Sequence, residues 1–178
     1  MGIIAQQKIA PSAPPQPPLH TIALLVRDYP GVLVRVGLVF ARRGYNIESL
    51  VVSPDVTGEF SRMTITCRGE AGTLEQIIKQ LWKLIDVVHA IDHTGQPVVE
   101  TEVALAKIKS PLAERTAILQ VAEHYKAKVV DYGAESLILQ VHGESDKLDS
   151  FIELLRPFGV VELVRSGKIL MARGPETT

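Results

Sequence analysis

Four stretches in the first half of the chain have the hydrophobic pattern of β-strands. They are residues 20–26, 47–53, 62–68 and 86–93. The third alternates most clearly, with Met63, Ile65 and Cys67 on one face and polar side chains on the other. The first is apolar on both faces, which is typical of an interior strand.

Two stretches between these strands have helical spacing. The first begins after the turn Tyr29-Pro30-Gly31 and ends at Gly44, and its apolar side chains are Val32, Leu33, Val36, Val39 and Phe40. The second follows residues 70–73, and its apolar side chains are Leu74, Ile77, Ile78, Leu81 and Ile85. The resulting order is βαββαβ, which predicts a ferredoxin-like split βαβ domain.

The same order returns after the break at Gly95-Gln96-Pro97. Strands are expected at residues 103–109, 128–132, 136–142, 160–165 and 168–172, with helices at 111–125 and around 148–155. The predicted fold class is therefore α+β, with two tandem ferredoxin-like βαββαβ domains. We expect the first at residues 19–95 and the second at 96–178. Residues 1–18 end in a proline-rich run, which favours a disordered tail over a proline-motif ligand.

Composition narrows the class of protein. Of 178 residues, 46% are hydrophobic and 22% charged, as in an ordinary globular protein. The formal net charge of −1 argues against a nucleic-acid binder, and no apolar run has membrane-spanning length. A single cysteine, Cys67, allows no intramolecular disulfide and favours a reducing compartment. The first ten residues lack the pattern of a secretion signal, so we expect a cytoplasmic protein.

Motifs of enzyme chemistry are missing from the sequence. It contains no GxxxxGK[ST], GxGxxG or GxSxG segment. His89 and His93 share one face of a predicted strand, but no third metal ligand follows at useful spacing, so solvent-facing histidines are the favoured interpretation. Cys67 lies on an apolar strand face, which favours a buried small hydrophobe over a nucleophile. We therefore expect no catalytic residues and no metal site.

The turn before the first helix is the candidate binding site. Pro30 presets the backbone, Gly31 allows close approach, and Asp28 could cap amides of the helix. Bare amides at a helix start can bind a small carboxylate, although an ordinary helix start is the alternative.

Three segments together resemble a known family. DYPGVLVRVGLVFARRGYNIESL at residues 28–50, SRMTI at 61–65 and LEQIIKQL at 74–81 resemble the small regulatory subunit of acetolactate (acetohydroxyacid) synthase. The resemblance is strong over residues 19–109 and extends to the remainder in layout and length. It implies an N-terminal ACT domain that pairs with a second copy through its sheet.

The resemblance also implies a site and a function. Valine is expected between two ACT domains, with Asn46 and Ile47 from one subunit facing five residues of the other: Asp28, Pro30, Gly31, Val32 and Leu33. Many members have Glu-Asn or Glu-Asp before the turn, where this chain has Arg27-Asp28. The chain would activate a catalytic large subunit and confer valine feedback inhibition in valine, leucine and isoleucine biosynthesis, without being an enzyme itself.

The cofactors and partners that we expect follow from the same resemblance. Thiamine diphosphate, Mg²⁺ and FAD are expected on the catalytic subunit, and none in this chain. The expected partners are that large subunit, a second copy of the chain, and valine or a related branched-chain amino acid. The alternative function is a free-standing ACT-domain amino-acid sensor that regulates another protein or transcription.

Overall fold

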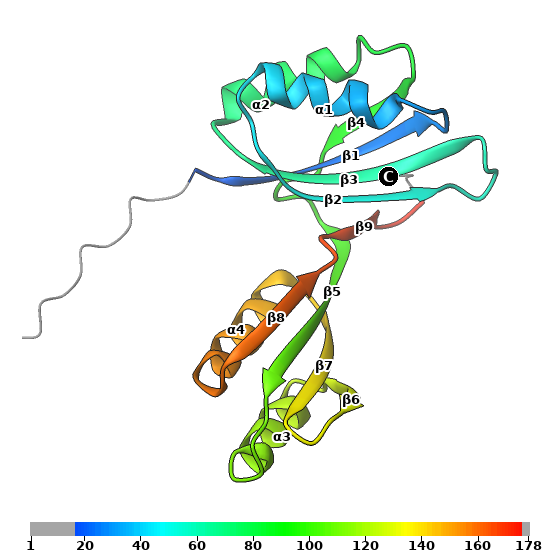
Figure 1. Cartoon of the computed structure of the whole chain (residues 1–178). Helices are drawn as coiled ribbons and strands as arrows, with labels where there is room; N and C mark the ends of the chain where they lie inside the picture. Colours follow the sequence, from blue (N-terminus) through cyan, green and yellow to red (C-terminus); the bar gives the residue numbers. More distant parts are fainter. Residues whose placement is uncertain (1–16, 176–178) are drawn as a thin grey trace, which may run out of the picture.

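The computed structural model describes residues 17–175, which form two βαββαβ units joined through one long strand, β5 (Figure 1). The predicted tail lies outside the described residues except for Pro17 and Pro18. No helix among residues 17–175 is long and apolar enough to cross a membrane.

The first unit contains the elements that the sequence pattern predicts. They are β1 (Leu19–Arg27), α1 (Val32–Arg42), β2 (Ile47–Pro54), β3 (Phe60–Arg68), α2 (Ala71–Leu81) and β4 (Val87–Asp92). The strand order is β2-β3-β1-β4, and each neighbouring pair is antiparallel. Strand β1 lies inside the sheet, between β3 and β4, as its apolar pattern predicts. Helix α2 ends at Leu81, so Ile85 lies beyond the helix, with 89% of its surface exposed.

One face of this sheet holds the core. Figure 1 shows α1 and α2 covering that face. Val36 and Phe40 of α1 are fully buried in the same core cluster as Ile65 and Cys67 of β3. Burial of each large apolar side chain contributes about 1.5–3 kcal/mol to the stability of the fold. The helical spacing of apolar residues on α1 and their alternation on β3 turn these side chains toward one core, and so they specify how α1 docks on the sheet.

The second unit repeats the topology of the first. It contains β5 (Val98–Lys109), α3 (Arg115–His124), β6 (Lys128–Tyr132), β7 (Ser136–Gly143), α4 (Ser145–Leu155), a 3₁₀ turn (Arg156–Phe158) and β8 (Val160–Arg165). The strand order is β6-β7-β5-β8, and the helices pack on one face over a separate core. The predicted α+β class with two tandem ferredoxin-like units is confirmed.

Strand β5 begins five residues earlier than the sequence predicts. Its first part leaves the second sheet and pairs with β9 (Ile169–Ala172), from Val98↔Ala172 to Thr101↔Ile169. This two-stranded ribbon lies on the side of the first sheet opposite α1 and α2 (Figure 1). The turn before β9 touches β2: a Cβ placed on Gly167 would lie only 2.7 Å from the Cβ of Ser49. The end of the chain therefore returns to the first unit.

Candidate functional site

Gly31 holds the turn between β1 and α1 in the left-handed region, at φ +85°. It is the N-cap of α1, and its carbonyl accepts a hydrogen bond from the Arg35 amide at 3.1 Å. Within residues 17–175, the amides of Gly31, Leu33 and Val34 have no hydrogen-bond partner. Three amides at one helix start are thus available to an anion such as a carboxylate.

Arg35 lies beside these amides, one helical turn along α1. Its Nη2 atom forms an ion pair with Oδ2 of Asp86 at 2.6 Å, and Asp86 is 8% exposed. A Cβ on Gly31 would lie 3.5 Å from Nη1 of Arg35, so the guanidinium borders the open turn. A fixed guanidinium next to free amides strengthens the attraction for a carboxylate. Sequence reasoning missed Arg35; its spacing of four residues from Gly31 was the available signal.

Asp28 does not cap the helix. Its amide donates to the carbonyl of Glu59 at 3.0 Å, and α1 has no side-chain cap. The expectation that this carboxylate occupies the helix amides is therefore wrong. The Asp28 side chain has no ion-pair or hydrogen-bond partner among the described residues, and the residue is exposed. It leaves the amides free and can itself face an ammonium group.

The remaining residues of the turn differ in exposure. Pro30 is exposed, and Leu33 is 46% exposed on the outer surface of α1. Val32 is 3% exposed, and its side chain belongs to the core of the first unit. Leu33 is thus placed to contact an apolar ligand group, whereas Val32 anchors the start of the helix.

Asn46 and Ile47 lie far from this turn within one chain. Strands β1 and β2 are both antiparallel to β3, so they run in the same direction. The turn follows the end of β1, whereas Asn46 precedes the start of β2, at the other end of the sheet. The 11 residues of α1 between them span about 16 Å. A single chain does not bring the two predicted halves of the site together.

Strand β2 is an edge of the first sheet. Among residues 17–175 it pairs only with β3. A second copy, related by a two-fold axis, could pair its own β2 antiparallel with this edge. The strands of the second copy would then run in the opposite direction to those of the first. Asn46 of one copy would then lie at the same end as the Gly31 turn of the other.

Cys67, His89 and His93 are the other side chains that the sequence offered as possible nucleophiles or metal ligands. Cys67 is fully buried, and burial raises the pKa of its thiol to about 11, which supports its interpretation as a small hydrophobe. His89 is exposed and makes an edge-to-face contact with Trp82 at 5.4 Å between ring centroids. His93, in contrast, is only 6% exposed, so the solvent-facing interpretation is wrong for it. Within residues 17–175, no three His, Cys, Asp or Glu side chains are grouped to hold a metal.

Two family models match the chain, one over each unit. Residues 22–89 match an AHAS small subunit-like ACT domain, and residues 101–174 match the small subunit of acetolactate synthase. The chain is thus an ACT-domain protein with a second, family-specific unit.

Individual relatives cover nearly all of the chain. It is 43% identical over 155 residues to a probable acetolactate synthase small subunit of Archaeoglobus fulgidus, covering 87% of this chain and 97% of that one. It is 40% identical over 158 residues to the acetolactate synthase small subunit of Mycobacterium leprae, covering 89% and 94%. The crystal structure of the acetolactate synthase small subunit from Thermotoga maritima matches with a TM-score of 0.80 and 35% identity, over 89% of this chain and 99% of that one. This chain belongs to the family of acetolactate synthase small subunits.

Proposed function

We propose that this chain is the non-catalytic regulatory subunit of an acetolactate synthase in the cytoplasm. It activates the large catalytic subunit and confers feedback inhibition by valine on the biosynthesis of branched-chain amino acids. Thiamine diphosphate, Mg²⁺ and FAD belong to the large subunit. The similarity to small subunits over nearly the whole chain supports this assignment.

The turn at Gly31 suits an amino acid. The ligand carboxylate accepts hydrogen bonds from the free amides beside Arg35, its ammonium faces Asp28, and its side chain contacts Leu33. A helix terminus contributes about 0.3–1 kcal/mol, and up to about 2 when partly buried. Burial of an isopropyl group adds roughly 1.5–3 kcal/mol. A dissociation constant near 0.1 mM to 10 μM needs about 5–7 kcal/mol, so contacts from Arg35 and from a second subunit complete the affinity.

The second subunit supplies Asn46 and Ile47. One observation carries this part of the proposal: the two halves lie at opposite ends of one sheet whose outer strand, β2, has a free edge. Two copies joined along β2 form two equivalent sites, each with a turn from one chain and a strand start from the other. Valine then stabilises one arrangement of the dimer, and the catalytic subunit responds to that arrangement.

Substitution of Gly31 by Asp tests the site. The carboxylate of Gly31→Asp occupies the free amides beside Arg35 and repels the carboxylate of valine. Gly31→Asn is the matched control, because Asn has nearly the same size and the same tolerance of a positive φ without the charge. We expect valine affinity at least about tenfold lower for the Asp variant than for the Asn variant. Calorimetry of valine binding measures this, beside a valine titration of the reconstituted enzyme.

Both variants should still activate the catalytic subunit. If the two variants bind valine equally well, the turn is not the carboxylate site. If activation disappears together with valine inhibition, the turn contacts the catalytic subunit instead. A free-standing sensor would bind valine and leave the catalytic subunit unaffected by the presence of this chain.

A further inference from the structure

Three large apolar side chains are exposed where α2 passes into β4, within residues 82–88. Trp82 is 47% exposed, Ile85 89% and Val88 42%. The ring of Trp82 lies beside β4, where it makes the edge-to-face contact with His89. Single exposed apolar residues are common, but several on one turn are typical of a surface that a partner covers. We call Trp82, Ile85 and Val88 the α2–β4 patch.

A basic groove of about 480 Å³ adjoins this patch and includes Trp82. Its other lining residues are Arg43, Gln76, Lys79, Gln80 and Lys83. Three of these side chains are cationic and none is acidic. Nη1 of Arg43 donates to the amide oxygen of Gln76, and Lys79 pairs with Glu75 at 2.6 Å. Lys83 has no ion-pair partner among the described residues, so the groove is positively charged.

The α2–β4 patch stays accessible in the proposed dimer. Strand β4 is the outer strand of the first sheet on the side opposite β2. Among residues 17–175 it pairs only with β1. Two copies joined along β2 therefore leave β4 and the patch on the far side of each sheet, where another protein can reach them.

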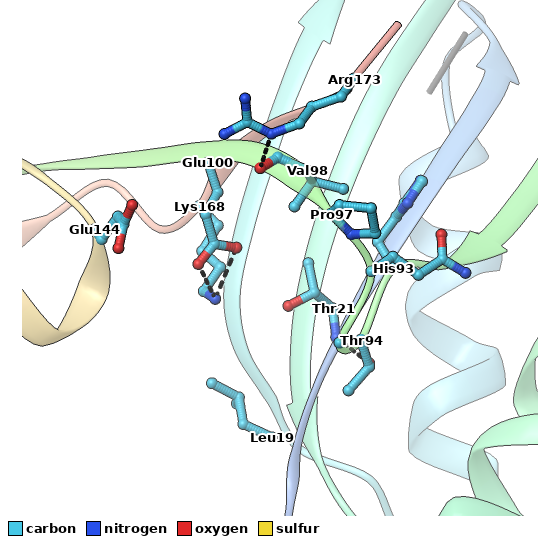
Figure 2. Close-up of a pocket in the computed structure, with 12 residues that line it drawn as sticks. Leu19, Thr21, His93, Thr94, Pro97, Val98, Glu100, Glu144, Lys168 and Arg173 are labelled. Carbon is cyan, nitrogen blue, oxygen red and sulfur yellow. Dashed lines mark hydrogen bonds and ion pairs between the residues drawn. The ribbon is translucent and has the colours of Figure 1, made fainter. Parts of the chain in front are cut away.

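The junction between the two units is built differently (Figure 2). There Nζ of Lys168 bonds both carboxylate oxygens of Glu100, at 2.8 and 3.0 Å. Nε of Arg173 donates to the carbonyl of Val98 at 3.2 Å. These polar contacts are made within one chain, so they need no second protein. The α2–β4 patch, in contrast, leaves apolar surface in contact with water.

The turn that carries Ile85 is tied to the proposed valine site. Asp86 follows Ile85 and forms the ion pair with Arg35, which borders the Gly31 turn. The carbonyl of Asp86 also accepts a 2.8 Å hydrogen bond from the amide of Arg27, at the end of β1. A protein docked on Ile85 would therefore lie next to a residue that is bonded to both sides of the Gly31 turn.

We propose that the α2–β4 patch and the basic groove dock the large catalytic subunit, through a surface of that subunit that is apolar at its centre and acidic around it. This inference rests on the proposed function, because it names the contact through which activation occurs. Trp82 is the central anchor, since a few well-covered side chains, tryptophan prominent among them, carry most of the energy of such interfaces. The cations of the groove attract carboxylates of the partner. The formal net charge of −1 favours this acidic protein surface over a nucleic acid.

Activation of the purified catalytic subunit by the full chain tests the proposal. The concentration of small subunit that gives half-maximal acetolactate formation is measured for the parent, Ile85→Asp and Lys83→Glu. We expect it to rise at least about tenfold for Ile85→Asp, because the interface then buries an unpaired carboxylate. It should rise at least about threefold for Lys83→Glu, and less in high salt, which screens charges at the rim of an interface.

Leu112→Asp and Arg173→Glu are the matched controls. Leu112 is 85% exposed in the second unit, and Arg173 is exposed at the junction drawn in Figure 2. Both variants should activate at the parent's concentration. Ile85→Asp should also keep the parent's sedimentation and its affinity for valine by calorimetry, which shows that the variant is folded and dimeric.

The proposal is overturned if the parent activates while Ile85→Asp and Lys83→Glu activate at the parent's concentration. It is also overturned if Ile85→Asp sediments as a monomer, because the patch then joins two copies of the chain. Loss of binding to a single-stranded DNA probe in Lys83→Glu, with activation unchanged, would assign the groove to nucleic acid instead. Failure of the proposed function has a different signature, because the parent itself then neither binds nor activates the catalytic subunit, and both proposals fall.

Discussion

Cys67 illustrates how burial decides the chemistry of one residue. Its side chain is fully buried in the first core, and burial raises the pKa of the thiol to about 11. We expect the native protein to react with a thiol reagent at pH 8 at least about 100-fold more slowly than the denatured protein, in which the thiolate is abundant. Absorbance-monitored labelling with and without denaturant measures the ratio. Equal rates would show that the first core opens readily.

The environments of three single residues could not be predicted from the sequence. Pro30 and Gly31 were sufficient to predict the turn before the first helix, because φ restrictions are local. The lack of a cap at Asp28, the position of Arg35 beside the turn and the burial of His93 were not predictable in this way. The first two depend on partners far along the chain, namely Glu59 and Asp86, and the strand pattern alone does not report how deeply His93 is buried.

The turn before β9 approaches β2 closely at Gly167. Gly167 has φ +82°, and a Cβ there would meet the Cβ of Ser49 at 2.7 Å and Cγ2 of Val51 at 3.4 Å. Strand β2 begins next to Asn46, in the proposed valine site. The turn thus connects the proposed valine site with the second unit through one strand.

Gly167→Ala should separate the units at this contact. The added methyl group forces the turn away from β2, so we expect a loss of about 1–3 kcal/mol in the free energy of unfolding beyond the backbone strain. Gly174→Ala is the matched control, since Gly174 has the same φ of +82° with open space around it. Thermal unfolding of both variants compares the effects. Equal destabilisation would show that only the backbone conformation matters at Gly167.

The pattern of elements was predictable, but their pairing across the chain was less so. Alternation and helical spacing indicated both βαββαβ orders, because each unit buries one face of its sheet. The first part of β5 was missed because its polar residues, Thr101 and Glu102, interrupt the apolar run. Its strand conformation depends on pairing with β9, about 70 residues away, and periodicity does not report such distant contacts.

For the whole molecule, the proposed valine site requires an assembly of at least two copies. In the proposed dimer, two copies pair along the free edge of β2, so that their first sheets are continuous and Gly31 of one copy lies near Asn46 of the other. A clean monomer in sedimentation at micromolar concentration, with and without valine, would exclude the shared site.

Mixed dimers give the most direct test of that shared site. Gly31→Asp damages the turn, and Asn46→Ala damages the strand start, so neither variant alone should bind valine well. When the two are denatured and refolded together, about half of the dimers are mixed, and each mixed dimer has one intact and one doubly damaged site. Calorimetry should then recover about a quarter of the parent's valine sites, at the parent's affinity. Recovery of no sites in demonstrably mixed dimers would contradict a valine site built from two chains.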